Sequence, residues 1–506
     1  MYRRSVVPIA LLASMLVTPA APIADATTPG TSSKFQLVGH DPLFSRGMNA
    51  ALAIFSHFVY VGSRTDGSDT CAVTGTSGCP HLHPGVQIVD VADPSDPDVV
   101  GEIGPPDEGT VGQTSRELRV WPQQKLLLVM NFRCSPFLHA CADTPFPGKY
   151  DITFYDLTDP VHPKLVSSYA PSRKPHEMFL WVDPTNANRA LLYTSNGSGT
   201  HTEVIAADIS GARQGKFKEI AKFSADDLYT PDEHKACGLD IFVHSLSISP
   251  DGTRGYLAYW CGNFLVVDTS DLAKNVRSPK IRLITPVPNR PTWPNPHGHS
   301  AVKVPGRPFV LTTDEVYGNL LTPFDPAAEH DGCPWGWSRA INIADPTHPF
   351  IAGEYRIAEN QDAFCGTDPE LNPDFNRVSF SSHNLTVLPD VAFIAWHSGG
   401  LQAVDVTDPA NPATAGFFVP EPLASVATED PALSFTDPNQ TQPLINKVVM
   451  WSYPVIDGGL IYVVDIRNGL YILRFTGQGS MEVKNTAFLE GNSNLGDAVE
   501  LEPVTG

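Results

Sequence analysis

The sequence predicts an all-β fold, a seven-bladed β-propeller whose N-terminal strand closes the last blade. Seven short apolar runs each end in an aliphatic pair, followed by an acidic residue or by another residue in its place. The runs lie about 50 to 75 residues apart. Such a unit is long enough for four antiparallel strands, and repeated units bury their faces only by stacking on one another. Seven of them form a seven-bladed ring. The runs are residues 86–90, 153–156, 205–208, 265–268, 340–342, 401–405 and 470–473.

The sixth unit shows the expected strands most clearly. Alternating apolar residues are interrupted by Pro389-Asp390, by residues 397–400 and by residues 408–412. Proline presets φ and aspartate bonds its own backbone, so these interruptions are typical of turns between the strands of a meander. The predicted strands are residues 384–388, 391–396, 400–406 and 413–419.

The last unit has only three strand-like segments: residues 448–455, 460–466 and 469–475. Residues 34–40 resemble the outer strand of the other units. We therefore predict that they pair with residues 469–475, because an unpaired edge would leave the ring interrupted.

Composition and the N-terminus favour an exported protein. The chain has 506 residues, 42% of them hydrophobic, and a net charge of −21, which argues against nucleic acid or an anionic membrane surface as a partner. Arg3 and Arg4 precede a short apolar core, and Ala24-Asp25-Ala26 has the pattern of a signal-peptidase site. The apolar core is too short for a membrane span. We expect a signal peptide at 1–26, a propeller at 27–480 and a C-terminal tail at 481–506, with no transmembrane segment and a secreted or extracytoplasmic location.

Eight cysteines fall in near pairs, and no C-x-x-C spacing indicates a zinc site. Closure of short loops favours local disulfides, which also fit an oxidising compartment. The predicted pairs are Cys71–Cys79, Cys134–Cys141, Cys237–Cys261 and Cys333–Cys365.

Two resemblances to known families follow from particular segments. Residues 382–387, 391–396 and 400–409 resemble the repeats of LVIVD-repeat β-propeller proteins, and a degraded form of the pattern covers roughly residues 35–475. Residues 244–247, 249–252, 256–260 and 267–268 show a fainter likeness to the selenium-binding and methanethiol-oxidase propellers. That second likeness implies copper-dependent thiol oxidation and extends to a single matching residue, His244.

Four consecutive units place histidine at the same position of the innermost strand. Because innermost strands line the axis of a propeller, equivalent side chains lie at one height and can converge. Neutral imidazoles are common ligands of iron, copper and zinc. The aligned residues are Asn49 or its neighbour, Arg116, His176, His244, His299, His383 and Trp451.

The sequence leaves three interpretations of the four histidines open. They could bind one transition metal, with iron or copper favoured, in an arrangement that resembles the four-histidine iron centre of carotenoid oxygenases. They could instead form hydrogen bonds between blades, for which Ser245 and Ser300 are suitably placed, or line a metal-free pocket. A metal held by four imidazoles with no carboxylate would keep its full charge, which favours a redox-active ion.

The roles of the neighbouring residues are less specific. Arg116 could bind an anionic substrate or form a salt bridge. Strand alternation directs Glu117 and Glu177 away from the axis unless a bulge redirects them, and either could support a ligand or contact substrate. His297 and His397 are expected to be loop residues rather than a fifth ligand.

No nucleophile elbow, phosphate-binding glycine loop or His-Glu-x-x-His helix is present in the sequence. We therefore expect an exported propeller with a metal-binding histidine site and, if it is an enzyme, a metal-dependent oxidoreductase that acts on a small molecule. The alternative is a non-catalytic extracellular or cell-surface scaffold that binds a small molecule or a protein.

Overall fold

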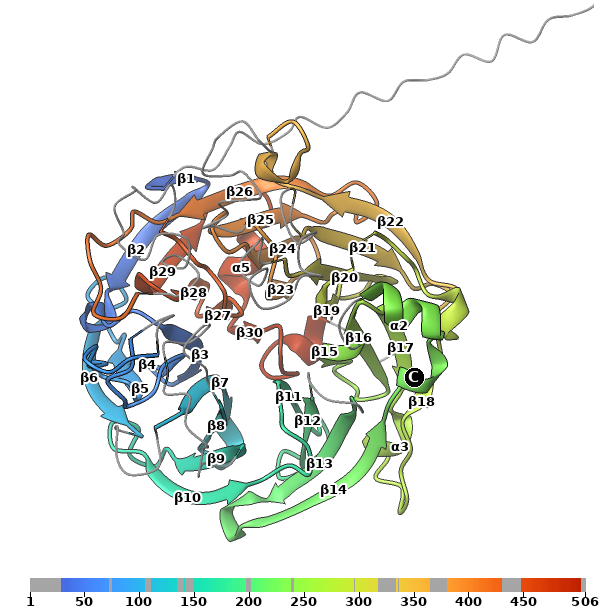
Figure 1. Cartoon of the computed structure of the whole chain (residues 1–506), viewed down its shortest axis with the longest axis horizontal. Helices are drawn as coiled ribbons and strands as arrows, with labels where there is room; N and C mark the ends of the chain where they lie inside the picture. The colour runs from blue at the N-terminus through green and yellow to red at the C-terminus, as the bar shows by residue number, and fades with distance from the viewer. Residues whose placement is uncertain are drawn as a thin grey trace, which may run out of the picture.

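The computed structural model shows an all-β propeller in which antiparallel sheets surround one axis (Figure 1). It describes residues 29–71, 75–104, 111–133, 141, 150–196, 202–237, 241–294, 296–316, 334, 336–364, 380–429 and 447–501. The predicted signal peptide lies outside these residues. No helix in the described ranges is long and apolar enough to cross a membrane.

Hydrogen bonding groups the described strands into six sheets rather than the predicted seven. The eight-stranded sheet contains two successive meanders, which a backbone pairing between Ser63 and Ser115 joins. The first meander consists of β3 (Asn49–Phe55), β4 (Phe58–Ser63), β5 (Val86–Asp90) and β6 (Asp98–Ile103). The second consists of β7 (Gln113–Trp121), β8 (Leu126–Arg133), β9 (Asp151–Asp156) and β10 (Lys164–Tyr169).

Three four-stranded sheets follow along the chain. The first contains β11 (Glu177–Val182), β12 (Ala190–Ser195), β13 (Val204–Gly211) and β14 (Lys216–Phe223). The second contains β15 (Phe242–Ile248), β16 (Arg254–Trp260), β17 (Asn263–Asp268) and β18 (Arg282–Leu283). The third contains β19 (Gly298–Lys303), β20 (Phe309–Asp314), β21 (Ser338–Asn342) and β22 (Phe350–Tyr355).

Two five-stranded sheets complete the ring and combine both ends of the chain. One contains β23 (Leu385–Val387), β24 (Val391–Ala395), β25 (Leu401–Asp405), β26 (Ala413–Val419) and β1 (Thr31–Ser33). The other contains β27 (Val455–Asp457), β28 (Leu460–Asp465), β29 (Gly469–Phe475), β2 (Phe35–Asp41) and β30 (Phe488–Glu490). Short α-helices lie between or after strands: α2 (Pro231–Cys237), α3 (Ser270–Ala273), α5 (Ser480–Asn485) and α6 (Ala498–Leu501).

The N-terminal strand closes the ring as predicted. Strand β2 pairs with β29, with Phe35 opposite Phe475 and Asp41 opposite Leu470. Strand β1 adds to the neighbouring sheet by pairing with β26. One continuous N-terminal segment therefore ties two sheets together, which Figure 1 shows in blue beside the orange and red strands.

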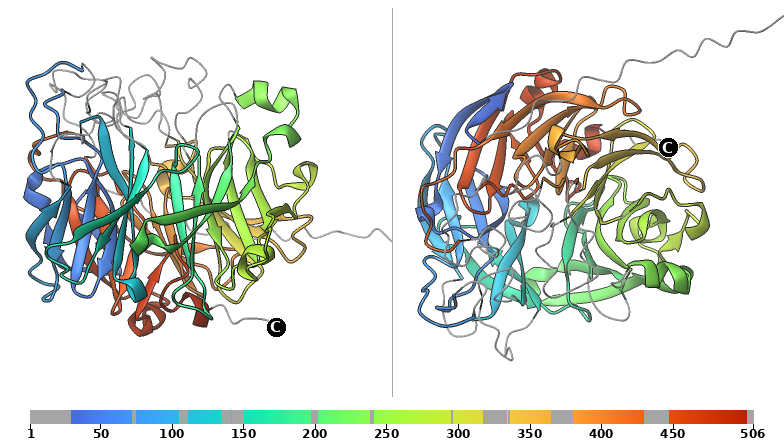
Figure 2. Two further views of the ribbon diagram at one scale, coloured as in Figure 1. Left: turned by 90° about the horizontal axis from the view of Figure 1, so that it is seen from below. Right: turned by 45° about the horizontal axis from the view of Figure 1, so that its top comes forward.

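The segment expected to be a C-terminal tail contributes to the fold. Strand β30 pairs with β27, and it lies inside the ring near β11 and β15 (Figure 1). Asn492 and Asn494 exchange backbone hydrogen bonds with Leu180 of β11. The side view places this red segment at one end of the ring (Figure 2).

Apolar side chains fill the spaces between successive sheets. One cluster packs Phe179 and Tyr193 of one sheet against Val243 and Leu257 of the next. Another packs Tyr60 and Ile88 of the first meander against Leu118 of the second. Interiors packed in this way hold the strands in fixed positions, so side chains near the axis are also held in place.

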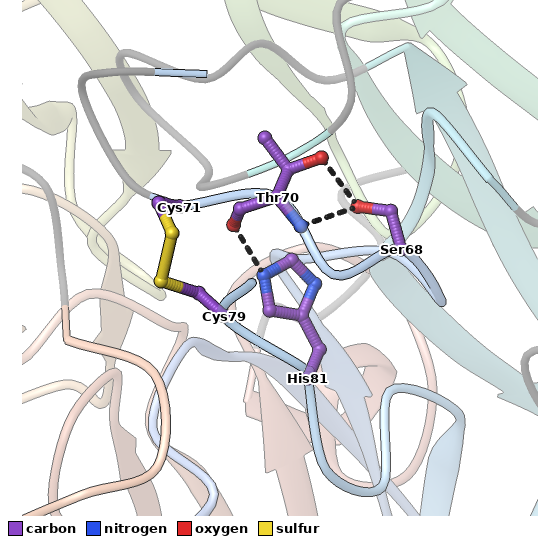
Figure 3. The surroundings of a disulfide bond; sticks show 5 residues. All are labelled: Ser68, Thr70, Cys71, Cys79 and His81. Carbon is purple, nitrogen blue, oxygen red and sulfur yellow. Dashed lines mark hydrogen bonds between the residues drawn. A yellow bond between two sulfur atoms is a disulfide. The ribbon is translucent and has the colours of Figure 1, made fainter. Parts of the chain in front are cut away.

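The Cys71–Cys79 disulfide forms as predicted. His81 lies beside it, with Nε2 at 2.9 Å from the carbonyl oxygen of Thr70, and Ser68 donates a hydrogen bond to the Thr70 hydroxyl (Figure 3). Cys141 and Cys261 are also disulfide-bonded. Their predicted partners, like the Cys333–Cys365 pair, lie outside the residues or side chains that the structure describes.

Candidate metal centre

Bulges in the innermost strands turn particular side chains toward the axis. In β15 the register moves from Val243 opposite Tyr259 to Ser245 opposite Ala258, which leaves His244 as an extra residue. Strand β19 skips His299 in the same way, and β7 skips Arg116. A bulge re-aims the extra side chain, and the sequence contains no strong signal for it.

His176 and His383 occupy the same place in their own sheets. The His176 backbone N–H donates to Ser195, which also pairs with Glu177. The backbone of Ala395 likewise bonds to both His383 and Asn384. Two residues therefore oppose one residue in each sheet, and the four predicted histidines are structurally equivalent.

The four imidazoles form a continuous row. The Nε2 atoms of His176 and His244 lie 2.9 Å apart. The ring centroids of His244 and His299 are 4.2 Å apart, and those of His299 and His383 are 3.7 Å apart. The structure thus brings together all four histidines that the sequence singled out.

Glu315 lies among these imidazoles, although the sequence did not indicate it. It directly follows β20, is only 1% exposed, and its backbone N–H donates to the carbonyl oxygen of His297. Its Oε2 lies 3.6 Å from Nε2 of His244 and 3.7 Å from Nε2 of His299. Its Oε1 lies 2.9 Å from Nε2 of His383. The expectation of a cluster without a carboxylate is therefore wrong.

His397 joins the cluster as well, contrary to the loop role favoured from the sequence. It follows β24 in a turn with a φ of 28°, and its Nε2 lies 3.7 Å from Oε1 of Glu315. His297, the other expected loop residue, packs its ring edge-on against Trp260 at 4.5 Å. The structure thus separates two histidines that the sequence could not distinguish.

A second set of equivalent positions explains why Glu315 was missed. Arg64 and Glu315 each directly follow the second strand of a meander, and the backbone N–H of each bonds to the residue just before the first strand. His397 lies at the corresponding end of β24. Aligning the repeat units on their first strands covers only part of the axis, because the ends of the second strands also face it.

Hydrogen bonds assign the tautomers of two imidazoles. Nδ1 of His383 lies 2.7 Å from the carbonyl oxygen of Trp451, which can only accept, so Nδ1 carries hydrogen. Ser300 donates to Oδ1 of Asn384 at 2.9 Å, so its oxygen accepts from Nδ1 of His299 at 2.8 Å. In the neutral form of both rings, Nε2 therefore presents a lone pair toward Glu315, as a metal ligand does.

Burial determines the protonation of the cluster. Burial and the charge of Arg116 lower the pKa of His176 to about 4, and burial lowers the pKa of His397 to about 3. Burial and neighbouring imidazoles also hold the pKa values of His244 and His299 well below the ordinary value.

The pKa of Glu315 is shifted in the opposite direction to the pKa of a lone buried acid. Burial alone would raise its pKa, but the His383 and His299 imidazoles bring it well below the ordinary value. Metal binding requires an ionised carboxylate, and the lowered pKa of Glu315 favours that form.

The two glutamates that the sequence placed near the site have different surroundings. Glu117 forms an ion pair with Arg119 at 2.9 Å. Glu177 has a carboxylate oxygen within 4.8 Å of ring nitrogens of His176 and His244, so it lies beside the histidines. Burial and the charge of Glu117 raise the pKa of Glu177 well above its ordinary value, which favours its protonated form.

The remaining aligned positions lack histidine and have other roles. Asn49 accepts a hydrogen bond from Nε of Arg46 and donates one to Ile466. The Trp451 ring lies 4.9 Å from the ring of His383. Trp451 therefore forms one wall beside the histidines.

The donor atoms suit a transition metal. Ligands about 2.1 Å from a common ion are roughly 3.0 to 3.4 Å from one another, depending on geometry. The four Nε2-to-carboxylate distances of 2.9, 3.6, 3.7 and 3.7 Å are close to these values. Two groups with donors within 4.8 Å share Glu315: one adds His244 and His299, the other His383 and His397.

A comparison with known protein families supports the assignment of the chain to the β-propellers. The LVIVD repeat family matches residues 381–418, which form β23 to β26 and supply His383 and His397. The protein is therefore an all-β propeller. More particularly, it is a propeller that carries an LVIVD repeat. No curated protein gives a significant match.

Solved structures give fold likenesses at low identity. Sqt1 of Chaetomium thermophilum is 11% identical with a TM-score of 0.43, covering 86% of each chain. The periplasmic gluconolactonase PpgL of Pseudomonas aeruginosa is 11% identical with a TM-score of 0.43, covering 76% of this chain and 89% of that one. The propeller domain of Myceliophteria thermophila Cps50 (Swd1) is 9% identical with a TM-score of 0.42, covering 84% and 96%.

Proposed function

We propose that the protein binds one transition metal on the propeller axis and uses it for redox or oxygen chemistry on a small molecule. The observation that carries this proposal is the position of Glu315, whose two carboxylate oxygens face four imidazole Nε2 atoms. We assign His244, His299, His383, His397 and Glu315 as ligands, with His176 next to them. A mixed nitrogen and oxygen set of this kind suits iron or copper.

A network of hydrogen bonds alone accounts poorly for this arrangement. Nε2 of neutral His383 would present a lone pair to a carboxylate oxygen at 2.9 Å, because Nδ1 already donates to Trp451. His299 has the same tautomer, and its buried Nε2 has no hydrogen-bond partner among the described residues. A proton could relieve one such contact, but charging several buried imidazoles is costly. One cation relieves all of them.

The protein residues around the metal would control its reactivity. A bound ion supplies a Lewis acid and a one-electron redox centre. Ser300 and the Trp451 carbonyl hold two imidazoles by their Nδ1 atoms, which fixes ring orientation. Glu177, in its protonated form, could deliver a proton near His176. The selenium-binding and methanethiol-oxidase likeness remains a resemblance and does not name the substrate.

We also infer that the ring has seven blades and that the protein is exported. The two meanders of the eight-stranded sheet pack face to face through their own apolar cluster, as separate blades do. The Cys71–Cys79 disulfide and the signal-like sequence at residues 1–26 fit an oxidising compartment outside the cytoplasm.

Elemental analysis of protein purified without a histidine tag tests the metal proposal. We expect about one iron or copper ion per chain, and a loss of at least tenfold in Glu315→Gln. Glu500→Gln is a matched control, since Glu500 is exposed in α6 and should retain the metal. Folded protein that binds no metal after reconstitution would contradict the proposal and favour the binding-scaffold alternative.

A further inference from the structure

Two buried guanidinium groups lie against one indole ring beside the proposed ligands. The guanidinium carbon of Arg64 is 4.7 Å from the Trp451 ring centroid, and that of Arg116 is 4.8 Å from it. The two side chains are 6% and 7% exposed. Two positive charges therefore contact one indole ring in a place that water hardly reaches.

Unlike Arg46, Arg119, Arg339 and Arg467, Arg64 has neither an anionic partner nor a hydrogen bond from its guanidinium group among the described residues. Its Nε and Nη1 atoms are buried without a hydrogen bond in the part of the chain that the structure describes. By contrast, Arg119, Arg339 and Arg467 each pair with a carboxylate. Arg46 donates instead to four backbone carbonyls, those of Val61, Gly62, His83 and Gly85.

An uncompensated buried cation is costly, so this arrangement needs a further group. Removing a charge from water is costly unless hydrogen bonds and an opposite charge replace the solvent. The stacking of Arg64 on Trp451 recovers only part of that cost. An anion that accepts from the unused N–H groups would supply the rest.

The arginine pair is also adjacent to the metal ligands. Trp451 contacts both guanidinium groups and lies 4.9 Å from the ring of His383. Arg64 occupies the position in its meander that Glu315 occupies in another. A ligand bound to Arg64 would therefore have its remainder near the histidines.

We propose that Arg64 and Arg116, with Trp451 as an apolar wall, bind the carboxylate of a small organic acid that is the substrate of the adjacent metal centre. This inference rests on the proposed function and adds the substrate class to it. A guanidinium fork matches the two oxygens of a carboxylate, and the indole provides a surface for the organic part. Trp451 would thus separate the recognition group from the ligand His383.

Isothermal titration calorimetry with acetate, pyruvate and benzoate tests the proposal. Acetamide and benzamide serve as neutral probes of the same shape. We expect at least one carboxylate to bind at least tenfold more tightly than its neutral counterpart, and Arg64→Met to remove most of that preference. Arg64→Lys, which keeps the charge and loses the fork, should fall between the two.

A matched control and a stability measurement exclude trivial causes. Arg277→Met removes an exposed arginine and should leave the affinity unchanged. In the absence of anions, the Tm of Arg64→Met should equal or exceed that of the native chain, because the substitution removes an unpaired buried charge. Equal binding of carboxylates and amides, or carboxylate binding that survives Arg64→Met, would overturn the inference.

The experiment also separates this inference from the proposed function when both chelator-treated and metal-loaded protein are titrated. Carboxylate binding that depends on Arg64 in protein unable to bind metal would support the anion site and refute the metal centre. Stoichiometric metal with no preference for carboxylates would support the metal centre and refute the anion site.

Discussion

Nε2 of His383 lies 2.9 Å from Oε1 of Glu315. The two residues belong to adjacent sheets and are 68 positions apart in the chain. The other ring nitrogen of His383, Nδ1, donates its hydrogen to the carbonyl oxygen of Trp451. A neutral imidazole in this setting has no hydrogen left for the carboxylate. The contact therefore needs either a proton on Nε2 or a metal cation bound to both atoms, and the metal cation is the basis of the proposed metal centre.

Ser300 should position a ligand without binding the metal itself. It accepts a hydrogen bond from Nδ1 of His299, and supporting groups of this kind typically change metal affinity about 10- to 100-fold. We expect Ser300→Ala to weaken metal affinity by that factor while the full stoichiometry is still reached at high metal concentration. Competition with a chelator measures the affinity. Ser247→Ala, on β15 and bonded to a backbone carbonyl, is the control, and an unchanged affinity in Ser300→Ala would contradict the role.

His397 and His297 should respond differently to substitution, although the sequence gives no reason to separate them. His397→Ala removes a proposed ligand and should lower metal content severalfold. His297→Gln should retain the metal, because His297 packs against Trp260 outside the assigned ligand set. Elemental analysis of both variants decides this, and the reverse result would show that the wrong histidine was assigned.

The different positions of His397 and His297 show which part of the site could not be predicted from the sequence. Repeated apolar runs and turns predicted the propeller, and innermost-strand alignment found four equivalent histidines. Glu315 and His397 escaped prediction because they lie just beyond second strands, where loops of variable length obscure the alignment. The bulges at His244, His299 and Arg116 are likewise set by backbone hydrogen bonds rather than by a residue pattern.

Ring closure should make the N-terminal strand important for stability. Phe35 is 6% exposed and packs on Phe393 and Phe475, so Phe35→Ala should cost about 3 kcal/mol of unfolding free energy. Leu37 lies in the same strand but is 54% exposed, so Leu37→Ala should change it by less than about 0.5 kcal/mol. Denaturant unfolding measures both, and similar effects for the two would contradict the closure described.

The disulfide loop should show a pH dependence that depends on His81. Burial opposes charge on His81, but the Asp66 side chain raises its pKa above the ordinary value. The folded state thus binds the proton more tightly than the unfolded state, so this contribution to stability is present below about pH 6.5 and decreases as the pH rises through the folded-state pKa. The difference in unfolding free energy between the native chain and His81→Gln should shrink over that range. A difference that grows with pH would show that the linkage has the opposite sign.

An anomalous-difference map from crystals of the metal-loaded protein tests the central claim most directly. The account predicts one strong peak on the propeller axis, about 2.0 to 2.3 Å from Oε atoms of Glu315 and from Nε2 atoms of His244, His299, His383 and His397. A map in which the imidazoles and Glu315 keep direct contacts, with no peak among them or with the metal bound elsewhere, would contradict it.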